Sequence, residues 1–327
     1  MHAPAASEGR IWPPVRIAFI GGCGRSGSTL LDLMLGELPG FFSAGEVRFI
    51  WQRGLVENQL CGCGAPFSGC PFWRAVGREA FGGWDKLNGE DMAALERAVD
   101  RHRYIPFLIA PGLWPGYRRR LARYTDVLSR LYRGIGRVAG AAYIIDSTKD
   151  PPFAFLLRRV PGLDLRVVHL ARDSRGVAFS WTKRVRKPEQ VETAGYMNTY
   201  HPVEMGFRWI VYNLLFHLLE RLGAPRLFMR YERLVSFPRV EIERVARHFD
   251  EEIREEHFAF LHGNGVDLGL HHTVSGNPMR FERGSIPLHL DDEWRTRLNP
   301  VHKRLVSIFT FPLLLCYGYI RWARPRE

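Results

Sequence analysis

A glycine-rich turn at residues 21–29 constrains the fold of this chain more than any other stretch. Its sequence is GGCGRSGST, and it follows an apolar, β-branched run at Val15–Ile20 and precedes leucines and a methionine at helical spacing over residues 30–38. This order predicts a strand, a glycine loop and a helix. Glycines let the backbone turn several N–H groups toward one point, where the helix N-terminus adds positive potential. The stretch therefore predicts an α/β fold with a cradle for an anion such as phosphate or sulfate.

The loop departs from the P-loop of nucleoside triphosphatases at one position. Gly22 and Gly27 enclose four residues, as that pattern requires, but Ser28 stands where it has lysine. The cation is instead Arg25, inside the loop. Because the P-loop lysine reaches the terminal phosphates of a triphosphate, its absence argues against an ATPase. A glycine turn that merely packs a strand against a helix is the alternative interpretation.

The overall charge favours an anionic partner. The 327 residues are 46% hydrophobic, as in an ordinary globular protein, and they carry a formal charge of +12. Such an excess suits a nucleotide, an acidic substrate, a membrane surface or a nucleic acid, and it does not choose between them.

Neither end of the chain predicts a membrane span. The first ten residues hold no apolar stretch of signal-peptide length, so we expect a cytoplasmic protein. The longest apolar stretch, residues 305–320, is short for a span and contains Pro312 and Gly318. We expect it to pack as a C-terminal segment, and the arginines after it leave weak peripheral membrane association open. No feature predicts an oligomeric state.

Three of the five cysteines cluster at Cys61, Cys63 and Cys70. A zinc site would need a fourth ligand, and no histidine or further cysteine stands at finger-like spacing. Free thiols in a tight loop are therefore favoured, with a local disulfide or zinc as alternatives. The pair His271–His272 lacks a third ligand nearby in the sequence, so no metal site is predicted there either.

Strand and helix patterns alternate after residue 140, which predicts a P-loop-like parallel sheet flanked by helices. Helical patterns cover about 153–159, 204–222 and 238–249, between strand candidates at 143–145, 165–170 and 227–230. Ligands of such sheets bind beyond the carboxyl ends of the strands. Polar residues follow each candidate strand, starting at Gly21, Asp146, Arg172 and Tyr231.

Residues 51–140 have a different composition from the rest. They are rich in Trp, Tyr, Gly, Pro and Arg and show helical patches at 91–102 and 118–132 without a strand pattern. No polar linker marks their ends, so we expect a mostly helical cap inserted into one domain. The expected parts are a core of about 15–50 and 141–290, the cap at about 51–140 and a C-terminal packing segment at about 291–327.

Two motifs in order resemble the paired signatures of sulfotransferases that use 3′-phosphoadenosine-5′-phosphosulfate, PAPS. RSGSTL at 25–30 is similar to the family's 5′-phosphosulfate loop, and LARDSRGVAFS at 170–180 to its 3′-phosphate motif of Arg and, eight residues later, Ser. The resemblance implies an enzyme that moves a sulfuryl group from PAPS to a hydroxyl and leaves the bisphosphate PAP. The donor-binding residues that the loop and the two motifs indicate are Gly24, Arg25, Ser26, Gly27, Ser28, Thr29, Arg172 and Ser180.

Shorter segments resemble further pieces of the tyrosylprotein and many bacterial sulfotransferases. A Gly-Glu pair ending at Glu46 is similar to the segment that holds their general base, and Lys149 stands in a segment similar to their Asn-Lys-Asp-Pro, whose Lys faces the sulfuryl group. Tyr231 matches a tyrosine that touches the nucleotide. A basic glycine segment implies nucleotide contacts for Asn277 and Arg280.

The chemistry agrees with these roles. Sulfuryl transfer needs in-line geometry and cations around the oxygens, which Arg25 and Lys149 supply. An alcohol has a high pKa, so a carboxylate such as Glu46 must take its proton as the bond forms; His201 is an alternative base. A sulfate monoester carries less charge than a triphosphate, so no metal is expected to be required. The acceptor is expected to be a small-molecule, lipid or glycan hydroxyl, with a tyrosine peptide less favoured.

Structural interpretations of the same residues stay open at this point. They are an ion pair of Glu46 with Arg48, an ion pair of Arg172 with Asp173, a solvated Lys149, a Ser180 bonded to its own helix and a core Tyr231. The aromatic residues Trp73, Trp84, Trp114 and Tyr117 are interpreted as core of the cap rather than as an acceptor surface.

Two other function classes compete with sulfuryl transfer. One is a P-loop-like nucleotide kinase, against which Ser28 counts. The other is a basic protein that binds nucleic acid or an anionic surface through residues 118–120 and 184–187. Solvated helix faces are the favoured explanation of those basic clusters, and no nucleic-acid partner is predicted.

Overall fold

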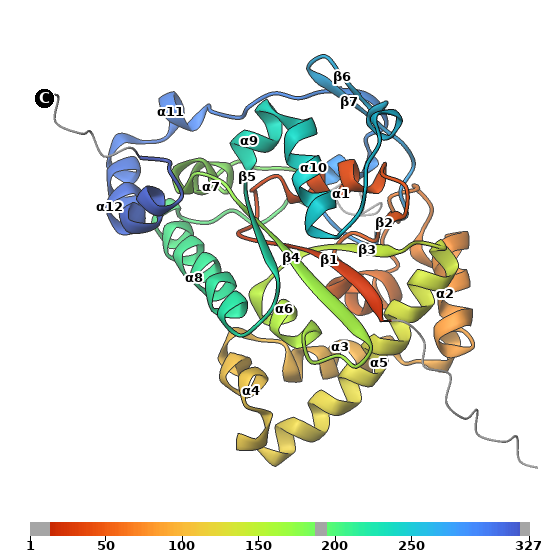
Figure 1. The fold of residues 1–327 in the computed structure, drawn as a ribbon. Coiled ribbons are helices and arrows are strands. Elements are labelled where there is room, and N and C mark those ends of the chain that lie inside the picture. Colours follow the sequence, from red (N-terminus) through yellow and green to blue (C-terminus); the bar gives the residue numbers. More distant parts are fainter. Residues whose placement is uncertain (1–13, 187–194, 321–327) are drawn as a thin grey trace, which may run out of the picture.

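A parallel sheet lies at the centre of the molecule (Figure 1). The computed structural model describes residues 14–186 and 195–320, and within them five parallel strands pair in the order β2-β3-β1-β4-β5. The predicted α/β class with a P-loop-like parallel sheet is confirmed. The strands are β1 (Val15–Gly21), β2 (Phe41–Ser43), β3 (Tyr143–Lys149), β4 (Leu163–Ala171) and β5 (Arg226–Arg230).

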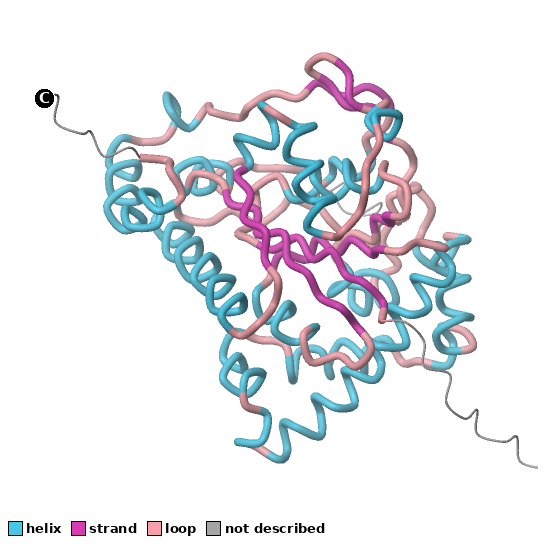
Figure 2. Tube along the Cα trace, viewed as in Figure 1, coloured by secondary structure: helices cyan, strands magenta, loops and turns pink. Residues whose placement is uncertain are grey.

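Helices cover both faces of the sheet, as Figure 2 shows. The alternation of side chains along the central strand β1 explains why: Ile17 and Phe19 enter one buried cluster, whereas Ala18 and Ile20 enter another on the opposite face. The α-helices outside residues 51–140 are α1 (Ser28–Gly36), α6 (Pro151–Leu157), α7 (Ser174–Ser180), α8 (Pro202–Arg221), α9 (Tyr231–Ser236), α10 (Pro238–His248), α11 (Trp294–Arg297) and α12 (Pro300–Cys316).

Residues 51–140 are mostly helical and contain no strand. Trp73 and Tyr117 are fully buried, in the same cluster that receives Ile17 and Phe19 of β1, while Trp114 is exposed. This stretch therefore shares its core with the sheet. Its α-helices are α2 (Pro71–Phe81), α3 (Gly89–Val99), α4 (Ile105–Ile109) and α5 (Pro115–Ala139).

The strand β3 runs farther than the predicted 143–145. Asp146, expected to open a polar loop, lies inside the strand opposite Phe19 of β1. Its carboxylate accepts hydrogen bonds from Thr148, at 2.6 Å from the hydroxyl, and from the Tyr132 hydroxyl. These bonds let a buried carboxyl continue the strand, which carries Lys149 to the carboxyl edge of the sheet.

Other predicted boundaries shift by a few residues. Tyr231, expected in a loop, is the first residue of α9, and the patch expected at 118–132 is part of the longer helix α5. A second, antiparallel sheet of β6 (Leu261–His262), β7 (Gly265–Leu268) and β8 (Gly284–Pro287) was not predicted. Its strands have two to four residues, too short for a reliable period of two.

The C-terminal apolar stretch forms α12, which runs through Pro312. Val306 and Thr310 are buried beside Gly206 of α8, whereas Ile308 and Phe309 on the other side of the helix are exposed. Among residues 14–186 and 195–320, no helix has both the length and the apolarity to cross a bilayer. The first ten residues, Lys187 and the arginines at 321, 324 and 326 lie outside the described residues.

Replacement of Gly22 by alanine is expected to cost far more stability than replacement of Gly140, a positive-φ glycine with open space around it. Gly22 has φ of 141°, and a Cβ there would overlap the Leu170 carbonyl oxygen of β4. Strain alone costs about 1–3 kcal/mol, so Gly22→Ala should lower the free energy of unfolding by more than about 3 kcal/mol in urea titrations. Gly140 has φ of 61° with open space around it, so Gly140→Ala should cost about 1–2 kcal/mol. Equal losses would contradict this account.

Candidate active site

A cavity of about 710 Å³ opens at the carboxyl edge of the central strands. Its lining comes from the glycine loop, from the ends of β3 and β4, from α9 and from the segment around residues 276–291. Most of the predicted site residues meet there. They are Gly24, Arg25, Gly27, Ser28, Thr29, Glu46, Lys149, Arg172, Ser180, Tyr231 and Asn277.

The glycine loop is shaped to receive an anion. Arg25 and Gly27 have left-handed backbone, with φ of 70° and 85°, and Gly27 is the N-cap of α1. A Cβ on Gly27 would lie 2.5 Å from the Tyr231 ring, so a side chain would close this approach. The first N–H groups of α1 point beyond its N-terminus, as in any helix, and Ser28 and Thr29 of this first turn line the cavity. The Oγ of buried Ser26 has no hydrogen-bond partner among the described residues.

Arg25 provides a cation at the loop. Its guanidinium lies over the Trp181 ring, 5.1 Å from the centroid, and donates to the Met197 sulfur at 3.2 Å. Burial lowers the pKa of Arg25, and the Glu46 charge opposes that effect. An anion in the cavity would therefore meet a desolvated positive charge.

Glu46 and Lys149 form an ion pair in the cavity. Lys149 Nζ donates to Glu46 and to the Ser147 carbonyl at 2.8 Å, and Arg53 Nη1 lies 3.8 Å from the other Glu46 oxygen. Burial favours the neutral form of Glu46, but the charges of Lys149 and Arg53 outweigh it and hold the pKa of Glu46 below its ordinary value. The carboxylate is therefore ionised at neutral pH, and it lies between two cations.

Backbone geometry fixes both partners of this pair. Gly45, before Glu46, has φ of 78°, and a Cβ there would lie 2.7 Å from the Ser275 carbonyl oxygen. Lys149 has φ of 73°, which is unusual for a residue with a side chain. Such strain persists where surrounding contacts determine the conformation.

The ion pair of Glu46 with Arg48 is not formed. Arg48 is buried and lies 2.6 Å from Asp100 and 3.4 Å from Glu96, and it also pairs with Asp150. This network ties the start of the helical stretch to α3 and to the end of β3.

Arg172 occupies another part of the cavity and does not pair with Asp173, which instead binds Arg175 at 2.6 Å and caps α7. Arg172 donates to the Arg25 carbonyl at 3.1 Å and to the Asp291 carbonyl at 2.6 Å. Its guanidinium also lies over the Tyr231 ring at 4.7 Å.

The Asp291 carboxylate is a second partner of Arg172, at 3.1 Å. Burial would raise the pKa of Asp291, but the Arg172 and Lys183 charges outweigh it and lower that pKa. Arg172 thus already holds one anionic group supplied by the chain itself.

Comparison with known proteins assigns the family. The profile of the sulfotransferase domain matches residues 92–262, just over half of the chain. The chain belongs to the sulfotransferase family. It is therefore an enzyme, a sulfotransferase, as the two motifs predicted.

Several solved structures are similar to this sulfotransferase. The sulfotransferase domain of the olefin synthase from Synechococcus PCC 7002 is 21% identical, with a TM-score of 0.49, over 91% of this chain and 95% of that one. The sulfotransferase domain from the curacin biosynthetic pathway is 16% identical, with a TM-score of 0.49, over 92% and 98%. Retinol dehydratase in complex with androsterone and PAP is 14% identical, with a TM-score of 0.40, over 97% and 84%. A search of curated protein sequences finds no match.

Two predicted donor-binding residues of the sulfotransferase do not line the cavity. Ser26 is a buried residue of the loop itself, and Arg280, expected to contact nucleotide, is buried and donates to the carbonyls of Thr273, at 3.0 Å, and Leu60, at 2.7 Å. Arg280 therefore fastens two chain segments together, where a nucleotide contact was expected.

Several cavity residues were not predicted. Trp181 directly follows Ser180, so the motif itself pointed to it. Arg208 and Tyr212 lie four residues apart on one face of α8, and a polar pair at that spacing in an apolar helix was a usable signal. Arg53 and Asp291 reach the cavity through tertiary contacts that no local pattern encodes.

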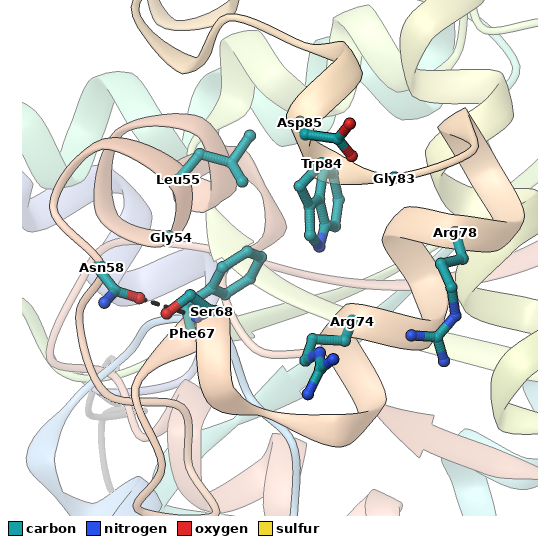
Figure 3. A pocket seen from close by; sticks show the side chains of 10 residues that line it. All are labelled: Gly54, Leu55, Asn58, Phe67, Ser68, Arg74, Arg78, Gly83, Trp84 and Asp85. Carbon is teal, nitrogen blue, oxygen red and sulfur yellow. Dashed lines mark hydrogen bonds between the residues drawn. The ribbon is translucent and has the colours of Figure 1, made fainter.

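A smaller cavity of about 490 Å³ lies within the helical stretch (Figure 3). Trp84 lines it together with Arg74 and Arg78, which stand one turn apart on α2. The predicted site residues are not part of its lining. Trp84, interpreted as core, is thus partly exposed to this cavity.

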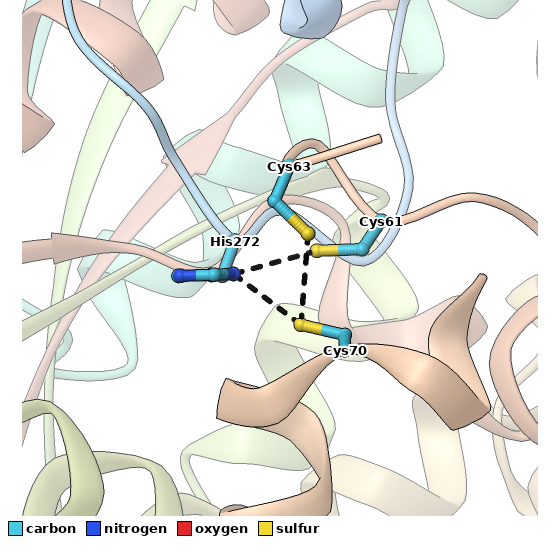
Figure 4. A group of neighbouring side chains, drawn as sticks. All are labelled: Cys61, Cys63, Cys70 and His272. Carbon is cyan, nitrogen blue, oxygen red and sulfur yellow. Dashed lines mark hydrogen bonds between the residues drawn. The ribbon is translucent and has the colours of Figure 1, made fainter. Parts of the chain in front are cut away.

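The sequence shows no fourth ligand near the three clustered cysteines, but the folded chain brings one to them. His272, distant in the sequence, brings its imidazole beside Cys61, Cys63 and Cys70 (Figure 4). The neighbouring His271 binds Glu37 at 2.8 Å instead.

Loss of the buried Arg48 is expected to destabilise the sulfotransferase strongly. Arg48→Met keeps an unbranched apolar stem but removes the guanidinium, which leaves the carboxylates of Asp100, Asp150 and Glu96 without their shared cation. Breaking a buried ion network costs about 3–5 kcal/mol, which urea unfolding would measure. Arg118→Met, at an exposed position of α5, should change stability by less than about 0.5 kcal/mol. A similar small effect for both variants would refute the structural role of Arg48.

Proposed function

We propose that this sulfotransferase moves the sulfuryl group of PAPS to a hydroxyl acceptor, with Glu46 as general base. The observation that carries the proposal is the Glu46–Lys149 ion pair in the same cavity as the glycine loop and Arg172. A base and a cation beside an anion cradle are what proton removal and charge stabilisation require.

The donor would bind across the cavity. The α1 N-terminus with Ser28 and Thr29 would hold the 5′-phosphosulfate, and Arg172 with Ser180 the 3′-phosphate. PAPS, when bound, supplies a sulfuryl group joined to phosphate through a bridging oxygen. Tyr231 would flank the nucleotide.

Glu46 would accept the proton of the acceptor hydroxyl as the acceptor oxygen bonds to sulfur and the bridging S–O bond breaks. Arg25 and Lys149 would balance the charge on the sulfuryl and leaving oxygens, and the loop N–H groups would receive the new charge on the 5′-phosphate. Lys149 serves two anions in this scheme. When the Lys149 ammonium also interacts with the sulfuryl oxygens, its attraction to Glu46 weakens. The pKa of the Glu46 carboxylate then rises, and the carboxylate becomes a stronger base.

The acceptor site would use the apolar part of the lining. Phe49, Tyr200 and Met205 line the cavity together with the cations. Such a mixture suits a small-molecule, lipid or glycan hydroxyl more than a tyrosine peptide. Residues 51–140 would act as an inserted helical cap, which contributes Arg53 to the site.

Binding of PAP is expected to stabilise the protein more than AMP or ATP does. A ligand at 100 times its Kd raises the free energy of unfolding by about 2.7 kcal/mol, which a thermal-shift titration detects. Arg172→Ala should weaken PAP binding about 10- to 100-fold because it removes a charged hydrogen-bond donor.

Two variants control this experiment. Glu46→Gln should leave PAP binding close to wild type and lower sulfuryl transfer about 10²- to 10⁴-fold. Arg175→Ala, which removes the partner of Asp173 outside the cavity lining, should keep the preference for PAP. Equal responses of the wild type to PAP and AMP would overturn the proposed donor, and equal loss of PAP binding in Glu46→Gln would make Glu46 structural.

The fall of kcat/KM at low pH, which is the acid limb of the pH–rate profile, should report the pKa of Glu46. Because its cations hold that pKa below 4.5, the carboxylate is already charged above pH 4.5, and kcat/KM should fall only as the pH drops through the lowered value. Arg53→Gln removes one cation, so the pKa should rise and the limb should move to higher pH. An unmoved limb in pH–rate profiles of that variant would exclude Glu46 as its source.

A further inference from the structure

A compact group of four ligand atoms lies outside the proposed transfer site. The sulfurs of Cys61, Cys63 and Cys70 and a ring nitrogen of His272 all lie within 4.8 Å of one another (Figure 4). None of these four described residues lines the 710 Å³ cavity. The cluster therefore needs an explanation of its own.

A tight turn presents two of the sulfurs. Cys61 N–H donates to the Ala65 carbonyl and Gly64 N–H to the Cys61 carbonyl, both at 2.8 Å, and Gly64 has φ of 89°. This turn directs Cys61 and Cys63 toward Cys70, which is the N-cap of α2. Positive potential at a helix N-terminus favours a thiolate at such a position.

A distant segment delivers the imidazole. Gly62 N–H donates to the Thr273 carbonyl at 2.9 Å, and a Cβ on Gly62 would lie 2.7 Å from the His271 carbonyl oxygen. Glycine thus permits the two segments to meet. The Phe72 ring stacks on His272 at 5.3 Å with an interplanar angle of 13°, which orients the imidazole.

The spacing of the four atoms matches one tetrahedral ion. Zn–S bonds of about 2.3 Å and Zn–N bonds of about 2.0–2.1 Å give tetrahedral edges of about 3.8 Å between sulfurs and about 3.6 Å between sulfur and nitrogen. The Cys63–Cys70 sulfurs lie 3.8 Å apart, and the His272 Nδ1 lies 3.8 Å from Cys61 and 3.3 Å from Cys70. These three of the six edges agree with the tetrahedral values within a few tenths of an ångström, and the other three are at most 4.8 Å.

We propose that Cys61, Cys63, Cys70 and His272 bind one Zn²⁺ as a structural ion. Three thiolates and one imidazole form a closed site, which is typical of structural zinc. Binding would release the three thiol protons to solvent and leave a net charge of −1. Arg283, which donates to the Gly62 carbonyl at 3.4 Å, brings a cation to this turn.

A disulfide would explain fewer of the four side chains than a zinc ion does. It would join two of the three sulfurs, with loss of two electrons to an oxidant, and it would leave the third thiol and the imidazole without a function. A zinc ion uses all four groups and needs no oxidant.

The ion would fasten the segment after His272 beside the transfer site. Val274 N–H donates to the Ala44 carbonyl at 3.0 Å, and the Ser275 carbonyl accepts from Glu46 N–H at 3.3 Å. Gly276 and Asn277, next in the chain, line the cavity. Zinc would therefore hold the backbone that supports Glu46 without touching the reacting atoms, and the metal site stands whatever reaction the cavity performs.

Metal analysis of the full chain tests the proposal. Protein purified without chelator should carry about one zinc per chain by plasma mass spectrometry. Substitution with Co²⁺ should give tetrahedral d–d bands and a sulfur-to-cobalt charge-transfer band. Addition of a chelator together with a thiol-modifying reagent should release the zinc and expose three additional reactive thiols.

Variants separate the site from the other cysteines and histidines. Cys61→Ser and His272→Ala should lose zinc during dialysis against a chelator, whereas Cys316→Ser and His262→Ala, at exposed positions, should retain it. Folded wild-type protein without stoichiometric zinc, or with iron in its place, would overturn the proposal. So would an intact mass two daltons low with a Cys63–Cys70 cross-link in its peptide map. The wild-type measurement decides even where a variant fails to fold.

Discussion

The close contact of three strand ends at Gly22 sets the geometry on which the site depends. Gly22 follows β1, its N–H donates to the Lys149 carbonyl of β3 at 3.3 Å, and its Cα lies against the Leu170 carbonyl of β4. A side chain at this point would push the strands apart. Because Lys149 ends β3 and Arg172 directly follows β4, the same contact fixes the distance between two of the cations that face the cavity.

Two carboxylates of the cavity lining, Glu46 and Asp291, each pair with two cations. Lys149 and Arg53 share Glu46, and Arg172 and Lys183 share Asp291. Clustered cations repel one another when they are taken out of water, so each carboxylate stabilises its pair of cations. The two carboxylates differ in origin, since Glu46 follows the short strand β2 whereas Asp291 belongs to a segment near the C-terminus.

The local sequence pattern was sufficient to predict part of this structure. The strand, glycine loop and helix at residues 15–36 follow from an apolar run, glycines and leucine spacing. The extension of β3 through Asp146 was missed because its polar residues are compensated by Tyr132, on a helix that the strand pattern does not include. Contacts between remote segments were also beyond reach: His272 meets Cys70 across 202 residues, and Asp291 meets Arg172 across 119. A sequence pattern can identify the site residues that lie together in one segment. It cannot identify a partner, such as His272 or Asp291, that only the folded chain brings close.

The Asp291 contact makes the chain a competitor of any anion that binds Arg172. The carboxylate is tethered, so its effective concentration at the guanidinium does not fall when the protein is diluted. A phosphate that takes the same guanidinium donors would have to displace it, which would lower the apparent affinity by a constant factor. The same carboxylate is ready to return when the phosphate leaves. A tethered competitor of this kind lowers the affinity for the anion and speeds its dissociation. Faster dissociation would favour turnover where the product nucleotide must leave before the next donor binds.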